Sequence, residues 1–141
     1  MKTIIVLGAN GMAGHVITMG LRLDSNNYNV VSVARSFSTV KPSVILDVSD
    51  FDGLKSLIYS NKPDVIINCI GLLNKAAEDN PSQAILINSY LPHFLEFITK
   101  NSNTKIIHIS TDCVFSGKRG GYVESDFVDS RDIYGLSKFL G

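Results

Sequence analysis

Tyr134 and Lys138 are the two residues of this sequence whose types and spacing most directly suggest catalysis. A spacing of four places both side chains on one face of a helix. A nearby ammonium group favours the phenolate and so lowers a tyrosine pKa that is ordinarily about 10. Such a tyrosine can exchange a proton with a substrate oxygen near neutral pH. The composition predicts about 0.3 such pairs by chance, so two surface residues are the alternative interpretation.

Three glycines with the spacing G-x-x-G-x-x-G follow a short apolar run near the start of the chain, at Gly8, Gly11 and Gly14. In a nucleotide-binding turn, one glycine allows the tight bend, another lets the backbone approach a pyrophosphate, and the third lets the next helix pack closely. The N-terminus of that helix then faces the phosphates. The composition predicts about 0.06 chance occurrences. The pattern therefore favours nucleotide binding over a purely structural turn, although it is one residue longer than G-x-G-x-x-G.

The residues after the second expected strand indicate which dinucleotide would bind. An NAD site usually places Asp or Glu about 20 residues after the glycines, to hold the ribose 2′-hydroxyl. This sequence has Arg35 and Ser36 there, and Arg35 could meet a 2′-phosphate. We therefore expect NADP(H) to be preferred, with NAD(H) as the alternative cofactor and a solvated loop arginine as the alternative interpretation.

A third group of polar residues, Ser110, Thr111 and Asp112, follows the last expected strand. A hydroxyl at that position could donate a hydrogen bond to a substrate carbonyl. A turn built by short polar side chains is the alternative. The order of the glycine turn, Thr111 and Tyr134 along the chain favours the catalytic interpretation.

Short β-branched and apolar runs alternate with helical patterns along the chain. Strands are expected at residues 4–7, 30–34, 44–46, 65–70 and 104–109. Helices are expected at 12–23, 51–59 and 80–101 and from about 132 onward, and Pro92 should bend the third of them. This order predicts an α/β fold with a doubly wound, mainly parallel sheet and helices on both faces. Ligands of such sheets bind at the carboxyl ends of the strands.

The composition excludes several classes of protein. The 141 residues carry no net charge, which argues against a nucleic-acid partner, and 45% are apolar, which argues against disorder. No apolar run approaches the roughly 18 residues of a membrane span. The two cysteines do not make a disulfide framework, and no metal site is predicted. We expect a cytoplasmic protein without a membrane partner.

At this point the sequence resembles the extended short-chain dehydrogenases/reductases, and most of all the dTDP-4-dehydrorhamnose reductase family. The resemblance covers nearly the whole chain. Its residues are Gly8 to Gly14, Asp47, Asn68 to Gly71, Asn88, the run Ile109 to Gly117 and the run Tyr134 to Lys138. The combination S-T-D-x-V-F-x-G plus Y-G-x-S-K is quite specific to this branch.

The resemblance implies a Rossmann-type NAD(P)-binding fold and a role for each matching position. Thr111, Tyr134 and Lys138 would be catalytic, with Lys138 also holding the nicotinamide ribose. The glycines would hold the pyrophosphate, Asp47 and Val48 would meet adenine, and Cys69, Ile70 and Gly71 would pass under the cofactor. The full set of implied cofactor-binding positions is Gly8, Asn10, Gly11, Met12, Gly14, Arg35, Ser36, Asp47, Val48, Cys69, Ile70, Gly71, Asn88, Ser110, Tyr134 and Lys138.

The implied activity is reduction of a nucleotide-linked 4-keto-6-deoxy sugar, with hydride from NAD(P)H and a proton from Tyr134. A role in polysaccharide synthesis follows from the resemblance alone. A nucleotide-sugar epimerase and a non-catalytic NAD(P)-binding regulatory subunit are the alternatives. Tight retention of the cofactor would favour the epimerase, and the intact Thr111, Tyr134 and Lys138 argue against the regulator.

Two features depart from the family pattern. Cys113 stands where dehydratases have Glu and many reductases have Tyr, and we expect a small buried side chain there rather than a redox role. Family members are also about twice as long. We therefore expect residues 1–141 to be the NAD(P)-binding domain, truncated in its catalytic helix and without the substrate-binding half. This chain alone should bind NADP(H) weakly and be inactive, and the resemblance is compatible with a homodimer of the full-length protein.

Overall fold

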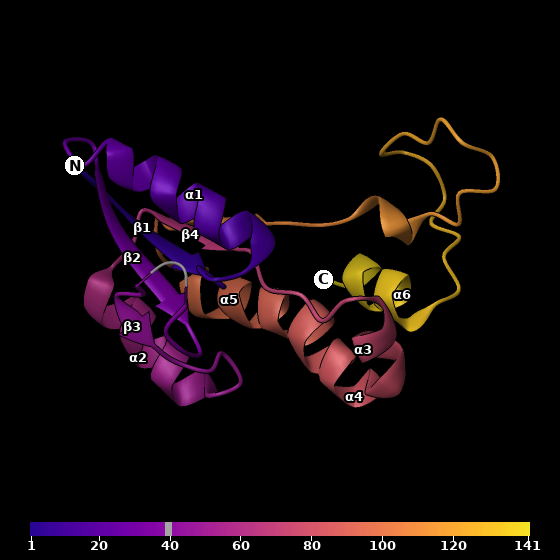
Figure 1. The fold of residues 1–141 in the computed structure, drawn as a ribbon, viewed down its shortest axis with the longest axis horizontal. Helices are drawn as coiled ribbons and strands as arrows, with labels where there is room; N and C mark the ends of the chain where they lie inside the picture. The colour runs from indigo at the N-terminus through magenta and orange to yellow at the C-terminus, as the bar shows by residue number, and fades with distance from the viewer. Residues whose placement is uncertain (39–40) are drawn as a thin grey trace. The chain divides into compact units, whose positions relative to one another are not determined.

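The computed structural model describes residues 1–38 and 41–141, which form two compact units (Figure 1). Unit one comprises Met1–Ile70 and Phe94–Ile109. Unit two comprises Gly71–His93 and Ser110–Gly141. The predicted nucleotide turn therefore lies in unit one, and the predicted catalytic side chains lie in unit two.

Unit one contains a parallel five-stranded sheet with the order β3-β2-β1-β4-β5. The expected strands are confirmed, with small changes at their ends. They are β1 (Lys2–Leu7), β2 (Tyr28–Ala34), β3 (Val44–Ile45), β4 (Val65–Asn68) and β5 (Lys105–His108). The order of the strands reverses between β1 and β4, where the chain crosses from one side of the sheet to the other. In open parallel sheets such a reversal is where ligands bind, outside the carboxyl ends of the strands.

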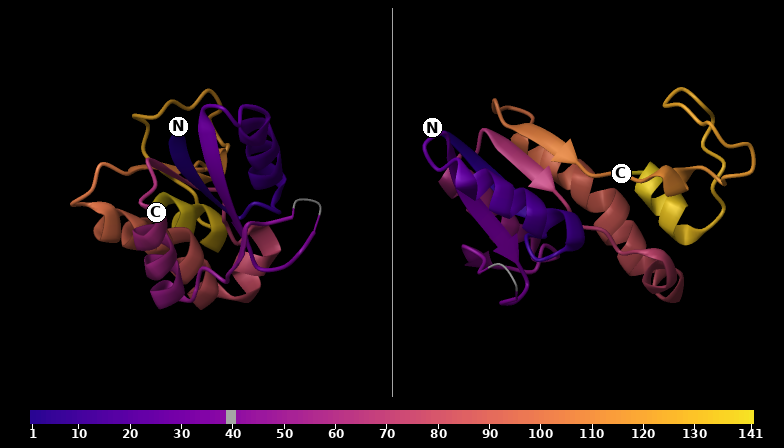
Figure 2. Two further views of the ribbon diagram at one scale, coloured as in Figure 1. Left: turned by 90° about the vertical axis from the view of Figure 1, so that its left-hand side faces the viewer. Right: turned by 45° about the horizontal axis from the view of Figure 1, so that its top comes forward.

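Helices cover both faces of this sheet, as the sequence predicts. Helix α1 (Met12–Leu23) lies on one face, and α2 (Phe51–Asn61) and α5 (Leu91–Thr99) lie on the other (Figure 2). Ile17 and Leu21 of α1 pack against Val6 and its neighbours on the sheet. On the opposite face, the rings of Phe51 and Phe94 lie 4.8 Å apart. The fold is Rossmann-like, and its glycine turn leads directly into α1.

Unit two is built mainly from helices. It contains α3 (Asn74–Asp79), α4 (Pro81–Ala84), the π-helix η1 (Ile85–Tyr90), the start of α5, the 3₁₀-helix η2 (Asp112–Val114) and α6 (Ile133–Phe139). Asn80 caps α4 by accepting a hydrogen bond from the Gln83 N–H, and Pro81 occupies the first turn, where proline is favoured. Helices α3 and η2 are not predicted by the sequence pattern.

The expected helix over 80–101 is present as α4, η1 and α5, which follow one another without a break. Pro92 has no N–H to donate, and its ring crowds the carbonyl of Asn88 one turn earlier. The wider π-helical turn of η1 ends at Tyr90, two residues before Pro92, and such turns interrupt the α-helical hydrogen-bond pattern. A change of helix type thus precedes Pro92, and the bend expected there stays a prediction.

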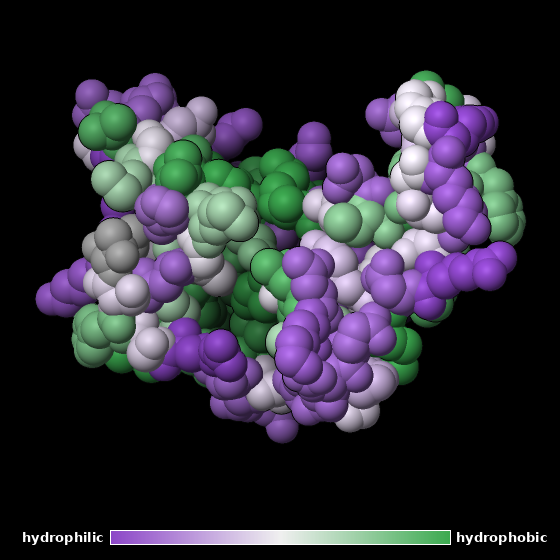
Figure 3. Space-filling model, turned by 45° about the vertical axis from the view of Figure 1, so that its right-hand side comes forward, coloured by the Kyte–Doolittle hydropathy of each residue, from purple (hydrophilic) through white to green (hydrophobic). Residues whose placement is uncertain are grey.

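Hydrophobic side chains reach the surface between polar ones on the face drawn in Figure 3. In unit one, the outer side of α1 is apolar at Met12, Val16, Met19 and Leu23, each at least half exposed.

No helix among residues 1–38 and 41–141 has the length and hydropathy needed to span a membrane.

Candidate functional site

The glycine turn at the carboxyl end of β1 is held tightly to the end of β2. The N–H groups of Gly8 and Ala9 both donate to the carbonyl of Val33, at 3.0 and 2.9 Å. The N–H of Gly11 donates to the carbonyl of Gly8 at 2.8 Å, and Gly8 has φ +78°, which favours glycine. The turn thus has a fixed backbone conformation at the place where the sequence predicts phosphate binding.

Gly14 is required by close packing. A Cβ atom at Gly14 would overlap the carbonyl group of Gly8, so α1 can start this close to the turn only with glycine there. At Gly11, a Cβ would meet only the Gly8 carbonyl oxygen, at 3.2 Å, and this residue is exposed. The turn role of Gly8 and the packing role of Gly14 are confirmed, and the contact of Gly11 with a pyrophosphate stays a prediction.

The N-terminus of α1 has the features of an anion site. Its N-cap, Gly11, offers no side-chain hydrogen bond, and no acidic residue lies in the first turn. The N–H groups of that turn therefore carry the positive end of the helix dipole without a side chain to neutralise it. These features fit the pyrophosphate of a dinucleotide.

Two loops beside this turn carry the residues predicted to select the cofactor. The Asn10 amide donates to the Ser36 carbonyl at 2.8 Å, which ties the glycine turn to the loop after β2. Hydrogen bonds from the side chain and backbone of Ser49 lower the pKa of Asp47, and the positive charge of Arg35 lowers it further. Arg35 and Ser36 are both exposed. An ionised Asp47 and an exposed Arg35 thus lie close enough for their charges to interact, and their predicted contacts with a cofactor stay predictions.

The end of β4 forms another side of the glycine turn. A Cβ at Gly8 would contact Ile70 and the backbone of Cys69, so these residues lie directly against the turn. The Asn68 side chain is buried, and its oxygen accepts a hydrogen bond from the Ile70 N–H at 3.1 Å. Burial raises the pKa of the Cys69 thiol, which keeps it neutral. Unit one therefore brings Gly8, Cys69 and Ile70 together, whereas Gly71 belongs to unit two, and the contact of these residues with a cofactor stays a prediction.

In unit two, Tyr134 and Lys138 lie on α6, and the residues between them hold that helix in place. A Cβ at Gly135 would overlap the Cys113 carbonyl and the Ser130 side chain. The Ser137 hydroxyl is 2.9 Å from the side-chain nitrogen of Asn88, which donates to it. The prediction that Tyr134 and Lys138 share one helix is confirmed, and close packing explains Gly135 while a hydrogen bond explains Ser137.

Lys138 is almost completely buried, with 4% of its surface exposed. Burial penalises the charged ammonium and lowers the pKa of Lys138 from its ordinary value of 10.5 to about 8. Tyr134 is half-buried one turn earlier on the same helix. A lysine with this pKa can hold or release a proton near physiological pH.

Thr111 is the N-cap of η2. Its hydroxyl accepts a hydrogen bond from the Cys113 N–H at 3.2 Å and donates to Asp112 at 3.4 Å. This is the turn geometry that the sequence offers as an alternative to a catalytic role. Because Gly135 lies against the Cys113 carbonyl, the turn also places Thr111 in the segment that packs on α6.

Asn88 is a buried centre of hydrogen bonding in unit two. Its side chain accepts from the Leu72 N–H at 2.8 Å and donates to the Leu72 carbonyl at 2.9 Å, in addition to its bond with Ser137. A buried amide must be satisfied in this way. These bonds join the 71–73 segment, η1 and α6, a structural role that sequence reasoning missed. The predicted contact of Asn88 with a cofactor stays a prediction.

The expectation of a buried Cys113 is wrong. Cys113 is exposed, and its Sγ lies 3.7 Å from a carboxylate oxygen of Asp112. The reason is that Gly135 packs against the backbone carbonyl of Cys113, which leaves the side chain on the outer side of the turn.

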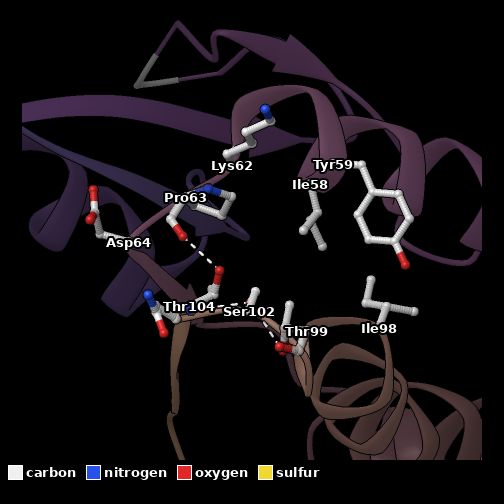
Figure 4. Close-up of a pocket in the computed structure, with 10 residues that line it drawn as sticks. Ile58, Tyr59, Lys62, Pro63, Asp64, Ile98, Thr99, Ser102 and Thr104 are labelled. Carbon is white, nitrogen blue, oxygen red and sulfur yellow. Dashed lines mark hydrogen bonds between the residues drawn. The ribbon is translucent and has the colours of Figure 1, made fainter.

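A pocket of about 390 Å³ in unit one lies away from the glycine turn (Figure 4). Ile58 and Tyr59 of α2 line it, together with residues 62–64 before β4 and 102–104 before β5. It is therefore at the amino ends of these strands, whereas Gly8 follows the carboxyl end of β1. Since ligands of parallel sheets bind at the carboxyl ends, this pocket is not the predicted nucleotide site.

The titration of Lys138 gives a testable effect on stability. Between about pH 8 and pH 10.5 the unfolded chain binds more protons than the folded one, so raising the pH over this range should favour folding. Relative to Lys138→Met, the free energy of unfolding of the unmodified protein should rise by about 3 kcal/mol across this window. Denaturant unfolding at several pH values measures it. The control is Lys75→Met, which removes an exposed lysine. If the free energy of unfolding varied with pH in the same way for Lys138→Met and the unmodified protein, the effect of burial on Lys138 would be contradicted.

The parallel sheet, the glycine turn and the helix with Tyr134 and Lys138 define a Rossmann-like α/β protein of the nucleotide-binding class. The family described as "RmlD substrate binding domain" matches residues 1–141. The chain therefore belongs to this family.

Known relatives carry names that agree with this membership. The dTDP-4-dehydrorhamnose reductase of Aggregatibacter actinomycetemcomitans is 34% identical over 143 residues, which are 100% of this chain and 46% of the relative. The crystal structure of a hypothetical dTDP-4-dehydrorhamnose reductase from Sulfolobus tokodaii is 35% identical, with a TM-score of 0.87, over 100% of this chain and 50% of that one. The Bacillus anthracis dTDP-4-dehydrorhamnose reductase in complex with NADP is 26% identical, with a TM-score of 0.85, over 99% and 47%. The chain thus spans about half the length of these relatives.

Proposed function

We propose that the protein is an NADPH-dependent reductase of a nucleotide-linked 4-keto-6-deoxy sugar. The observation that carries this proposal is the buried Lys138 one helical turn from Tyr134, on a helix against which the Thr111 segment packs. The names of the relatives support the class of substrate. Because the chain covers about half of those relatives, the activity is proposed for the protein expressed from its complete reading frame.

The cofactor would be held by the residues that the sequence singles out. Gly8, Gly11 and the N-terminus of α1 would bind the pyrophosphate, since their N–H groups and dipole suit an anion. Arg35 and Ser36 would meet the 2′-phosphate, and Asp47 and Val48 the adenine. The NADP complex of the Bacillus anthracis relative supports a nicotinamide dinucleotide.

When bound, the cofactor supplies the hydride for the carbonyl carbon of the sugar. Thr111 would donate a hydrogen bond to the carbonyl oxygen and orient it. Tyr134 would give its phenolic proton to that oxygen as it becomes an alcohol. Lys138, positively charged below a pH of about 8, would stabilise the phenolate that Tyr134 leaves behind.

A direct assay tests the proposed function. The protein expressed from its complete reading frame is mixed with NADPH and a dTDP-4-keto-6-deoxy sugar, and the loss of NADPH absorbance is compared with the amount of reduced sugar formed. Equal amounts support the reductase. An isomerised sugar without net NADPH consumption would indicate the epimerase, and no reaction would leave only the regulatory subunit.

Replacing Arg35 by Ala should separate the two cofactors. A charge-assisted contact with the 2′-phosphate would be lost, so the Kd for NADPH should rise about tenfold while that for NADH stays nearly constant. Both Kd values are measured by titrating the protein into NADPH or NADH and following the change in nicotinamide fluorescence. Lys2→Ala, at the opposite end of β1, is the matched control. An equal loss of affinity for both cofactors would refute the 2′-phosphate role.

A further inference from the structure

We propose that Glu78 is the positioning residue for Tyr134, an inference that rests on the proposed function. Glu78 lies on α3, and its Oε1 atom accepts a hydrogen bond from the backbone N–H of Ile133 at 2.6 Å. The two residues are 55 positions apart in the sequence. Ile133 is the first residue of α6 and directly precedes Tyr134.

The first turn of α6 depends on such outside partners. The first N–H groups of any helix have no acceptor within it, and a helix of seven residues is marginal by itself. Asp132 caps α6 by accepting from the Gly135 N–H at 2.7 Å. Glu78 satisfies the N–H of Ile133, so two carboxylates stabilise the positive end of this helix.

The far end of α6 is held by different residues. The Ser89 hydroxyl donates to the Ser137 carbonyl at 2.7 Å, and the Asn88 amide donates to the Ser137 hydroxyl. The Ser137 hydroxyl also donates to the Tyr134 carbonyl at 3.0 Å, so the Tyr134 turn has a contact on each side of it. Lys138, which directly follows Ser137, is held by contacts that do not involve Glu78. Loss of the Glu78 contact should loosen the turn that carries Tyr134 while leaving Lys138 in place.

This arrangement predicts a specific kinetic pattern. Proton transfer requires Tyr134 at an exact distance from the substrate oxygen, and a small displacement can cost as much as about 100-fold in rate. Cofactor binding does not depend on that distance. The Glu78 contact should consequently affect kcat and leave the Kd for NADPH nearly unchanged.

The neighbouring residue offers a matched control. Asp79 is also acidic, lies on the same helix and pairs with Lys75 at 2.8 Å, with both side chains mostly exposed. Asp79→Ala removes the same charge from α3 as Glu78→Ala does. Exposed pairs of this kind contribute little to stability.

The test compares Glu78→Ala, Glu78→Gln, Glu78→Asp and Asp79→Ala in the protein expressed from its complete reading frame. Glu78→Ala should lower kcat about tenfold with the Kd for NADPH within about twofold of its original value. Glu78→Gln should restore most of the rate, because its amide oxygen can accept the same bond. Glu78→Asp, one methylene shorter, should not, and Asp79→Ala should behave as the unmodified protein.

An unchanged kcat in Glu78→Ala, or an equal loss in Asp79→Ala, would overturn the inference. If Glu78→Ala does not fold, the difference between the Gln and Asp variants decides the question: equal rates in both would overturn the inference.

Hydrogen exchange separates this inference from the proposed function. The amides of residues 133–135 should exchange faster in Glu78→Ala or Glu78→Asp than in Asp79→Ala, whether or not any sugar is reduced. Failure of the unmodified protein to oxidise NADPH would overturn the proposed function, while unchanged exchange at residues 133–135 would overturn the role of Glu78.

Discussion

Replacing Tyr134 by Phe should lower turnover by about 1,000-fold and leave the affinity for NADPH nearly unchanged. The substitution removes one hydroxyl and keeps the ring, so α6 and its contacts through Gly135 and Ser137 should persist. Without the phenolic proton, the oxygen of the reduced carbonyl has no positioned donor. Steady-state kinetics with a saturating keto-sugar and a separate NADPH titration measure the two effects.

The matched control is Tyr59→Phe, which changes an exposed tyrosine of α2 in unit one. It should keep full turnover. Turnover of Tyr134→Phe within about twofold of the unmodified protein would remove Tyr134 from the proposed mechanism. A large loss of turnover in both variants would show that the loss is not specific to position 134.

Replacing Gly14 by Ala should destabilise the protein and abolish most NADPH binding. The added Cβ would overlap the Gly8 carbonyl, which is rigid backbone, so either the turn or α1 must move. Overpacking of this kind typically costs about 1–3 kcal/mol. The movement would also displace the N–H groups predicted to hold the pyrophosphate. Denaturant unfolding and nicotinamide fluorescence measure the two losses.

Gly20 provides the control on the same helix. A Cβ there would meet no atom within 4 Å, so Gly20→Ala should keep NADPH binding and stabilise α1 by about 0.5–1 kcal/mol. Equal stability and affinity in the Gly14 and Gly20 variants would contradict the close packing of the glycine turn.

The architecture of unit one is largely predictable because buried strands and helices impose local patterns. The expected helix over residues 12–23 matches α1 at both ends, and all five expected strands are present along the chain. Helix α3 escapes prediction because Asn74–Asp79 is short and mostly polar, without an apolar period. The π-helical form of η1 escapes it because Pro92 indicates where the hydrogen bonds break but not how the helix adapts.

The sequence predicts which residues form the candidate site, but it does not predict the hydrogen bonds that hold those residues in place. The spacing of Tyr134 and Lys138 indicates one helix, whereas the anchor from Glu78 connects positions 55 residues apart. No local pattern encodes such a contact, and the same holds for the bond between Asn88 and Ser137. The expectation of a buried Cys113 is wrong, because the exposure of this side chain depends on which side of the turn packs against α6.

The most direct test of the proposed function follows the hydride itself. The protein expressed from its complete reading frame is incubated with a dTDP-4-keto-6-deoxy sugar and NADPH that carries deuterium at the transferable position of the nicotinamide. Mass spectrometry and NMR of the product should show one deuterium at the carbon that carried the keto group, and almost none should form with Tyr134→Phe. A sugar that is recovered unreduced, or reduced without deuterium at that carbon, would contradict the account.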